Sequence, residues 1–309
     1  GDGKRAVPLN VNGIINLIKP PGISSAQAVS FVKQLTGQKC GHAGTLDPEA
    51  CGVLPIMVGK ATSLFDYIVQ EEKVYVAEVA FGQATDTQDA VGHVVAVGIN
   101  YPSTADVQRI LPAFVGHIMQ RPPAFSAIKR DGKRLYQLAR QGVSAEVEPR
   151  PIQIAAIDLL AQTQRQGCLI RVSCGKGTYI RTLCHDMGVM LGCPAHMRML
   201  IRERSGPFGI DQGITMEELE QAVTQDALPG PWLLTAADTL KHLPRLTAPH
   251  ACWKPCVNGV ALPVDDVPEA AALPEGALAT LYCRDALIGI YQRSGERLRV
   301  RVMLWEPQQ

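Results

Sequence analysis

The chain has 309 residues, of which 46% are hydrophobic and 19% charged, and its formal net charge is +1 at pH 7. These values predict a soluble globular protein with a large core, and the lack of any run of eighteen apolar residues argues against a membrane span. The nine cysteines include no C-x-x-C pair, and Cys252 and Cys256 have no further ligands at zinc spacing. We therefore expect reduced thiols, no metal site and a cytoplasmic location.

The chain begins with a polar stretch, residues 1–12, that has no apolar segment of signal-peptide type, and we expect a disordered lead there. Short elements follow, and Ser24 or Ser25 stands where a helix cap is expected. The elements predicted up to residue 114 are strands at 13–19, 73–81 and 93–97, a helix from the serine pair to Gly37, a helix-like segment at 59–69, a polar turn at 82–92 and a helix at 104–114.

Residues 120–150 do not have the pattern of a core segment. Between Arg121 and Arg150 there are seven basic residues, three acidic ones and few apolar anchors, with a short helix predicted at 135–141. A long basic insert of this kind is typical of a functional loop. Residues 165–204 are also basic, whereas residues 207–280 hold ten acidic and three basic residues. This segregation predicts a phosphate-binding surface on one part of the molecule.

The second half of the chain divides near Lys241, where proline and alanine become frequent. We expect a main domain at 13–245 and a small β-barrel-like domain at 246–309. The elements predicted here are strands at 152–160 and 168–174, helices at 178–191 and 217–223, and a hairpin of 287–291 with 298–304.

One segment, Gly41 to Pro55, has the sequence GHAGTLDPEACGVLP and holds Asp47 in a turn rich in glycine and proline. A single carboxylate on a stiff loop suits a nucleophile better than a hydrolase that needs two acids. The structural alternative is an aspartate that caps the next helix. Glu49 lies too close along the turn to flank a sugar as the second acid of a glycoside hydrolase.

This segment resembles the GH-x-G-T-LDP-x-A-x-GVLP loop of the TruB family of pseudouridine synthases. Further segments resemble motifs of that family in the same order: 19–25, 73–92, 121–142, 174–188 and 200–208. The resemblance implies an α+β fold with a mixed, mainly antiparallel sheet and a C-terminal PUA-like RNA-binding β-barrel. Cys51, Gly175 and Ser24 differ from the residues common in the family, which puts only local hydrogen bonds in doubt.

The resemblance also implies a function: isomerisation of the uridine at position 55, in the TψC loop of the tRNA T arm, without cofactor, metal or guide RNA. The protein is expected to flip the base into a pocket, to act as a monomer and to be able to help tRNA fold. Asp47 is the implied nucleophile or base, Arg181 its charge partner, and Tyr75 the ring that stacks on uracil. The implied substrate-binding residues are His42, Tyr179, Leu200, Lys19 and Pro20, and the implied RNA-backbone residues are Lys129, Arg130, Lys133, Arg134, Arg140 and Arg202.

Two other functions fit parts of the sequence. An RNA-binding protein that refolds RNA without chemistry fits the basic insert, but it has no need of Asp47, Tyr75 and Arg181 together. The guide-dependent catalytic subunit of small ribonucleoproteins has similar motifs, but the insert at 120–150 favours an enzyme that grips RNA by itself.

Without the family resemblance, Tyr75 is more typical of an ordinary core tyrosine.

Overall fold

A computed structural model of the chain describes residues 11–68, 72–126, 129–130, 133–142, 146–225 and 230–307, with the backbone alone for residues 129, 130, 133 and 135. Its helices are α1 (Ser25–Thr36), α2 (Phe65–Ile68), α3 (Thr104–Ile110), α4 (Leu135–Arg140), α5 (Ile180–Leu191), α6 (Met216–Thr224), α7 (Ala236–Thr239) and α8 (Trp253–Val257). Its strands are β1 (Gly13–Lys19), β2 (Cys40–His42), β3 (Cys51–Val58), β4 (Lys73–Phe81), β5 (Gln83–Thr85), β6 (Val94–Val97), β7 (Gly116–Gln120), β8 (Lys129–Arg130), β9 (Lys133–Arg134), β10 (Arg150–Thr163), β11 (Gly167–Cys174), β12 (Ala195–Ser205), β13 (Phe208–Gly209), β14 (Ile214–Thr215), β15 (Leu233–Leu234), β16 (Arg245–Ala248), β17 (Leu262–Pro263), β18 (Leu278–Cys283), β19 (Ala286–Ser294) and β20 (Arg297–Met303).

Helix α1 shows how local sequence sets an element in this fold. The hydroxyl of Ser24 accepts from the backbone N–H of Gln27, and the Gln27 side chain accepts from the backbone N–H of Ser24, which makes a capping box. Gly37 ends the helix at φ 67°, a conformation that glycine adopts without steric cost. Ala28 and Val32 face the core. The predicted helix is confirmed, and Ser24 rather than Ser25 is its cap.

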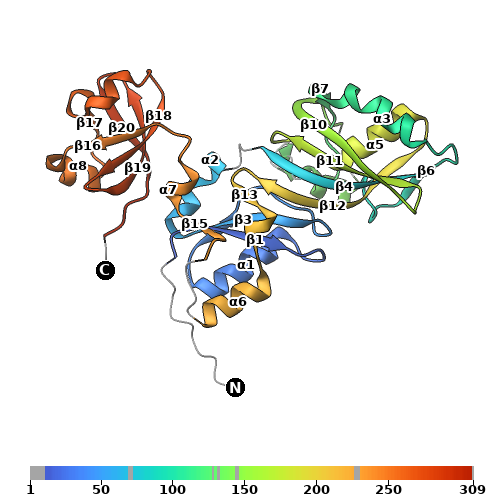
Figure 1. The fold of residues 1–309 in the computed structure, drawn as a ribbon, viewed down its shortest axis with the longest axis horizontal. Coiled ribbons are helices and arrows are strands. Elements are labelled where there is room, and N and C mark those ends of the chain that lie inside the picture. The colour runs from blue at the N-terminus through green and yellow to red at the C-terminus, as the bar shows by residue number, and fades with distance from the viewer. Residues whose placement is uncertain are drawn as a thin grey trace.

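The larger sheet runs in the order β14-β1-β3-β12-β4-β11-β10-β7. Neighbouring strands are antiparallel from β12 to β7 and between β1 and β3, while β3 pairs with β12 and β1 with β14 in parallel. The α+β class with a mixed, mainly antiparallel sheet is therefore confirmed. In Figure 1 the strands β4 and β12 cross the middle of this sheet, between the blue N-terminal half and the green half.

Helices cover one face of the sheet in two groups. The core on this face holds Val32 of α1 and Leu219 of α6 at one half of the sheet, and Leu183 of α5 and Val107 of α3 at the other half. Figure 1 shows α1 beside α6 under β1, and α3 near α5 beyond β11. The middle strands β12 and β4 carry Leu200, Arg202 and Tyr75. Helix α5 itself packs on β12 and β4, so these middle strands are in contact with the second group.

The smaller sheet, in the order β16-β18-β19-β20-β17, belongs to the C-terminal part of the chain. The β19–β20 pairing confirms the predicted hairpin at the end of the chain. Ile290 of β19 packs with Ile14, Met57 and Phe208 on the face of the larger sheet opposite the α1 and α6 helices. The ammonium of Lys60 lies 3.8 Å from the carboxylate of Glu306 at the same contact. The two sheets are thus joined by a shared apolar cluster.

Some elements differ from the predictions. Strand β3 and the central strand β12 were not predicted, and residues 83–85 of the predicted polar turn form β5, which pairs with β6. The predicted helix at 104–114 is α3 followed by a 3-10 turn over 111–114, where Pro112 falls. Among the described residues, no helix is both long enough and apolar enough to cross a membrane.

Candidate active site

The loop between β2 and β3 carries Asp47 on the helix-covered face of the sheet. Its apolar residues Leu46 and Ala50 are buried in the core of that face, which fixes the loop, while the Asp47 side chain is 40% exposed. A carboxylate oxygen of Asp47 lies 3.1 Å from Nε of Arg181, whose side chain is only 8% exposed. The pair therefore has one buried member and one that solvent or a ligand can reach.

Arg181, in the first turn of α5, holds three segments together. Besides Asp47, its guanidinium donates to the carbonyl of Thr87 at 3.2 Å and to the carbonyl of Phe125 at 3.0 Å. The next residue, Thr182, donates its hydroxyl to Oε1 of Gln88 at 2.7 Å. The loop after β5 and the start of the basic insert are thus both tied to the residue that pairs with Asp47.

The Asp47 loop is fastened to the segment before α1. The hydroxyl of Ser25 donates to the carbonyl of Leu46 and accepts from its N–H, at 2.9 Å each. The ammonium of Lys19, which is fully buried, donates to the carbonyls of Pro20, Ile23 and Pro48 at 2.7 to 3.0 Å. Burial lowers the pKa of Lys19, and the nearby acidic groups oppose that shift. Lys19 thus joins the two loops, while the Pro20 side chain is exposed at the surface.

Arg202 of β12 braces the loop from the other side. Its Nε donates to the carbonyl of Val53 at 2.8 Å and its Nη2 to the carbonyl of Gly44 at 2.9 Å. The residue is 1% exposed. The sequence analysis expected Arg202 to contact an RNA backbone, and this burial does not fit that expectation, because the guanidinium is enclosed and its donors point at protein carbonyls.

Tyr75 lies in β4 directly opposite Arg202 of β12, so both side chains project from the same face. Tyr75 is 8% exposed, and burial raises its pKa, while the positive charge of Arg202 acts in the opposite direction. Leu200, two residues before Arg202, is also 8% exposed and belongs to the same core face. The structure therefore brings Tyr75 and Leu200 together beneath the Asp47 loop.

Tyr179, just before α5, is held by a side chain that the sequence analysis did not single out. The amide of Gln120 accepts from the N–H of Tyr179 at 2.8 Å and donates to its carbonyl at 3.0 Å. The ring of Tyr179 lies 6.0 Å from the guanidinium carbon of Arg181, and burial raises the pKa of its hydroxyl. Gln120 ends β7 where the insert begins and is only 3% exposed, and no pattern in the sequence marks it as buried.

His42 ends β2 near the entrance of the site. Burial lowers its pKa, and the positive charges of Arg202 and Arg134 lower it further, so the imidazole is neutral at pH 7. Among the described residues its Nδ1 has no hydrogen-bond partner although it is buried.

The basic insert forms the β8–β9 hairpin and the helix α4. Arg134 and Arg140 are exposed, and the guanidinium carbon of Arg140 lies 5.5 Å from the ring centre of Tyr136. The side chains of Lys129, Arg130 and Lys133, predicted to contact RNA, lie outside the described residues. The backbone pairing of β8 with β9 nevertheless places all three on the same short pair of strands as Arg134.

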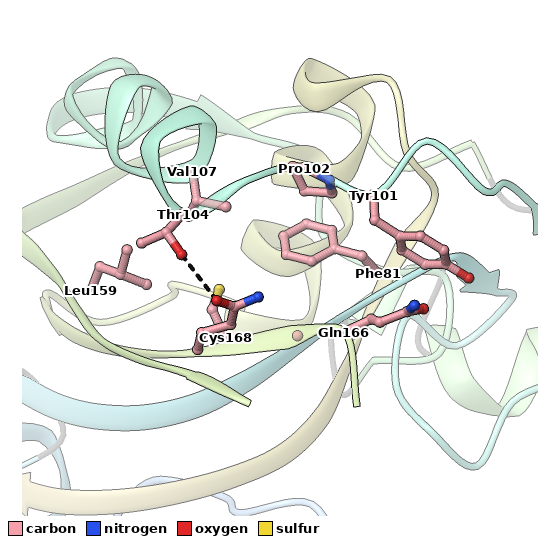
Figure 2. A pocket seen from close by; sticks show the side chains of 10 residues that line it. Phe81, Tyr101, Pro102, Thr104, Val107, Leu159, Gln166 and Cys168 are labelled. Atoms are coloured by element: carbon pink, nitrogen blue, oxygen red, sulfur yellow. Dashed lines mark hydrogen bonds between the residues drawn. The ribbon is translucent and has the colours of Figure 1, made fainter. Parts of the chain in front are cut away.

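A separate hollow of about 60 Å³ lies between α3, β4 and the β10–β11 turn (Figure 2). It is lined by Phe81, Tyr101 and Cys168, and the Thr104 hydroxyl donates to Oε1 of Gln162 at 3.3 Å along its side. Burial raises the pKa of Cys168 to about 12, so its thiol is protonated and unreactive at neutral pH. This hollow is too small for a nucleobase and carries no acid or base. Within the ranges that the structure describes, no group of three or more His, Cys, Asp or Glu side chains is placed to hold a metal.

Gly52, the first glycine after Asp47, gives a stability test of how closely β3 approaches Arg202 of β12. It has φ 109°, and a Cβ there would lie 2.2 Å from the carbonyl oxygen of Arg202, which is backbone and cannot move aside. We expect Gly52→Ala to lower the free energy of unfolding by about 2–4 kcal/mol. Gly192→Ala is the matched control, because Gly192 has φ 69° but open space around it, and it should cost about 1 kcal/mol. Denaturant unfolding measures both, and equal losses would contradict the close approach.

Family models and known proteins resemble this chain over most of its length. Residues 33–180 match the model described as TruB family pseudouridylate synthase (N terminal domain), and residues 181–233 match that of the tRNA pseudouridylate synthase B C-terminal domain. The chain is 46% identical to tRNA pseudouridine synthase B of Symbiobacterium thermophilum, over 81% of this chain and 83% of that protein. It is 36% identical to the protein of the same name from Pelotomaculum thermopropionicum, over 96% of each chain. A solved Cbf5-Nop10-Gar1 complex contains a similar chain, with a TM-score of 0.72 and 27% identity over 94% of this chain and 84% of that one.

Proposed function

Because the chain belongs to the TruB family of pseudouridylate synthases, we propose that it converts a uridine of tRNA to pseudouridine and that this uridine is position 55 in the TψC loop. The observation that carries the proposal is the pairing of a reachable Asp47 carboxylate with a buried Arg181, next to the buried ring of Tyr75. A base that enters from solvent meets the carboxylate first and the aromatic ring beneath it.

The reaction is an isomerisation that needs no added atoms or electrons. The bond between C1′ of the ribose and N1 of uracil breaks, a bond between C1′ and C5 forms, C5 loses a proton and N1 gains one. We propose that Asp47 assists this exchange, by adding to the uracil or the sugar or by taking a sugar proton. Arg181, with its Nε 3.1 Å from a carboxylate oxygen, holds the carboxylate in place. No cofactor or metal enters this scheme.

The other pocket residues are assigned to holding the flipped base. Tyr75 stacks on uracil, an interaction worth about 1–3 kcal/mol per base, and its protonated hydroxyl is available for transfer at C5. Tyr179 and Leu200 line the pocket, and Lys19 with Pro20 shapes its floor. The neutral imidazole of His42 suits contact with the stacked bases that the flipped uridine leaves.

We assign the exposed cations of the insert to RNA phosphates. Replacing Arg134 and Arg140 together by alanine should weaken tRNA binding and reduce the slope of log affinity against log salt by about 1.4–1.8, as expected for two lost phosphate contacts. The control is Arg109→Ala with Lys33→Ala, two exposed cations of the same domain that lie outside both basic stretches of the sequence. Binding measured between 50 and 200 mM salt tests this, and equal slopes for the two double variants would contradict it.

We extend the proposal to the C-terminal part, which we treat as a PUA-like RNA-binding domain at 246–309 attached to a catalytic domain at 13–245. Three exposed arginines, Arg297, Arg299 and Arg301, alternate along the outer side of β20 and support RNA contact there. We further propose that the protein acts as a monomer in the cytoplasm without a guide RNA. A chain of similar fold belongs to a solved archaeal box H/ACA sRNP Nop10-Cbf5 complex, whereas here the basic insert would give the protein its own grip on a T arm.

The experiment uses an unmodified tRNA transcript and the wild-type protein, with no cofactor and no second RNA. Chemical mapping should find pseudouridine at the T-loop uridine alone, and a hairpin with the sequence of the T arm should also react. Binding and refolding of the transcript are measured in parallel. Binding without modification favours an RNA chaperone, and modification that appears only after a guide RNA is added favours the guide-dependent class; either result contradicts the proposal.

A further inference from the structure

The two glycines that flank Asp47 and the buried Arg202 form one structural unit. Gly52 of β3 pairs with Lys19 of β1 on one side and with Arg202 of β12 on the other, and Arg202 pairs in turn with Tyr75 of β4. Residues that are paired across a sheet project from the same face. Four neighbouring strands thus present the row Lys19, Gly52, Arg202 and Tyr75 beneath the Asp47 loop.

Gly52 has no side chain, and this lets the backbone of Arg202 come close to it between the two buried cations, Lys19 and Arg202. A Cβ at Gly52 would lie 2.2 Å from the Arg202 carbonyl oxygen, and a Cβ at Gly44 would lie 3.4 Å from Nη1 of Arg202. Both glycines also have positive φ, 109° and 84°. Position 52 therefore takes glycine because the Arg202 backbone approaches it closely, while position 44 takes glycine because of its positive φ and lies in ordinary contact with the Arg202 guanidinium.

The hydrogen bonds of Arg202 explain what this closure does. Its guanidinium joins the carbonyl of Gly44, before Asp47, to the carbonyl of Val53, after it. The same charge acts on Tyr75, the residue directly opposite in the sheet. One planar group with donors in a fixed fork thus touches both ends of the loop and faces the aromatic residue of the pocket.

We propose that Arg202 is a positioning residue for the isomerisation, which holds both ends of the Asp47 loop at a fixed place relative to Tyr75. The proposal rests on the proposed function, since it concerns the relation between the carboxylate and the base that stacks on Tyr75. At 1% exposure Arg202 has no surface to offer RNA, so its effect passes through the two residues that it holds. A shift of about 1 Å between reacting groups is enough to slow a reaction about 100-fold.

The test compares Arg202→Met, Arg202→Lys and Arg204→Met with the wild type. Arg204 lies two residues further along β12 and is exposed, so it controls for loss of an arginine from this strand. Single-turnover rates of pseudouridine formation at saturating tRNA, tRNA affinities and thermal midpoints are measured for each. A saturating RNA concentration separates the rate from the affinity, and the folded fraction is checked at the assay temperature.

We expect Arg202→Met to lose about 100-fold in single-turnover rate while its folded fraction binds tRNA as the wild type does. Arg202→Lys keeps a cation that reaches one of the two carbonyls and should recover part of the rate, and Arg204→Met should leave it unchanged. A wild-type rate in folded Arg202→Met overturns the proposal, as does a loss that appears in tRNA affinity instead of rate. The proposal is also overturned if Arg202→Met and Arg202→Lys lose the same rate and that loss matches the loss of folded protein. Such a result indicates a purely structural role. If the wild type itself forms no pseudouridine, the proposed function is wrong and this role is lost with it.

Discussion

Asp47→Asn should abolish pseudouridine formation while tRNA binding persists. The amide keeps the size and shape of the carboxylate but has neither its charge nor its basicity, so a nucleophile or base at this position is removed. We expect the single-turnover rate to fall by about 10⁴-fold or more, the order seen when one catalytic carboxylate is lost. Affinity should change little, because Asp47 is one partly exposed group on a loop that the buried residues Leu46 and Ala50 anchor.

Glu49→Gln is the matched control for this prediction. Glu49 lies two residues away on the same loop, is exposed, and is the nearest acid that a two-carboxylate hydrolase has available. The expected rate for Glu49→Gln is that of the wild type. Full activity in Asp47→Asn would refute the assignment of the site, and equal losses in the two variants would indicate a mechanism that uses both acids.

Arg181→Met should give the second largest loss. The substitution removes the charge partner of Asp47 and leaves the carbonyls of Thr87 and Phe125 without their donor. We expect a rate loss of roughly 100-fold or more, because the carboxylate is no longer held, and a fall of about 1–3 kcal/mol in unfolding free energy. The expected fall in unfolding free energy is smaller than for a fully buried ion pair because the Asp47 side chain is 40% exposed.

Arg171→Met separates this effect from the loss of any ion-paired arginine. Arg171 of β11 pairs with Glu203 of β12 at 3.0 Å, and both side chains are partly exposed to solvent. Its loss should change the unfolding free energy little, because the pair is open to solvent, and should leave the rate unchanged. Denaturant unfolding and single-turnover assays on both variants test the contrast. The account of Arg181 fails if Arg181→Met reacts like Arg171→Met.

The sequence predicted some strands of the larger sheet and missed others that lie beside them. Strands 13–19 and 73–81 have clear patterns, whereas β3 contains Pro55, and proline argues against a central strand because it lacks an N–H. In the structure Pro55 pairs with Asn16, and its carbonyl accepts from the N–H of Ala43. The ladder therefore tolerates the missing donor, but that tolerance depends on strands that are distant in sequence.

In the candidate site, too, features set by the local sequence were predicted, and features set by contacts between distant segments were not. Asp47 stands out because its loop is rich in glycine and proline, and the structure places it against Arg181, as the family resemblance implied. Arg202 was expected to contact an RNA backbone, and the structure instead encloses it at 1% exposure. Its burial depends on the parallel pairing of β12 with β3, and no local pattern in the sequence indicates that pairing.

The measurement that tests the central claim most directly uses tRNA with tritium at C5 of its uridines. Tritium in water and free uracil are counted after incubation with the wild type and with Asp47→Asn. Isomerisation at one uridine predicts one tritium released for each tRNA modified by the wild type, no free uracil, and no release by the variant, because C5 exchanges its hydrogen for the bond to C1′. Free uracil would identify a hydrolase, and undiminished release by Asp47→Asn would show that the chemistry lies elsewhere; either result contradicts the account.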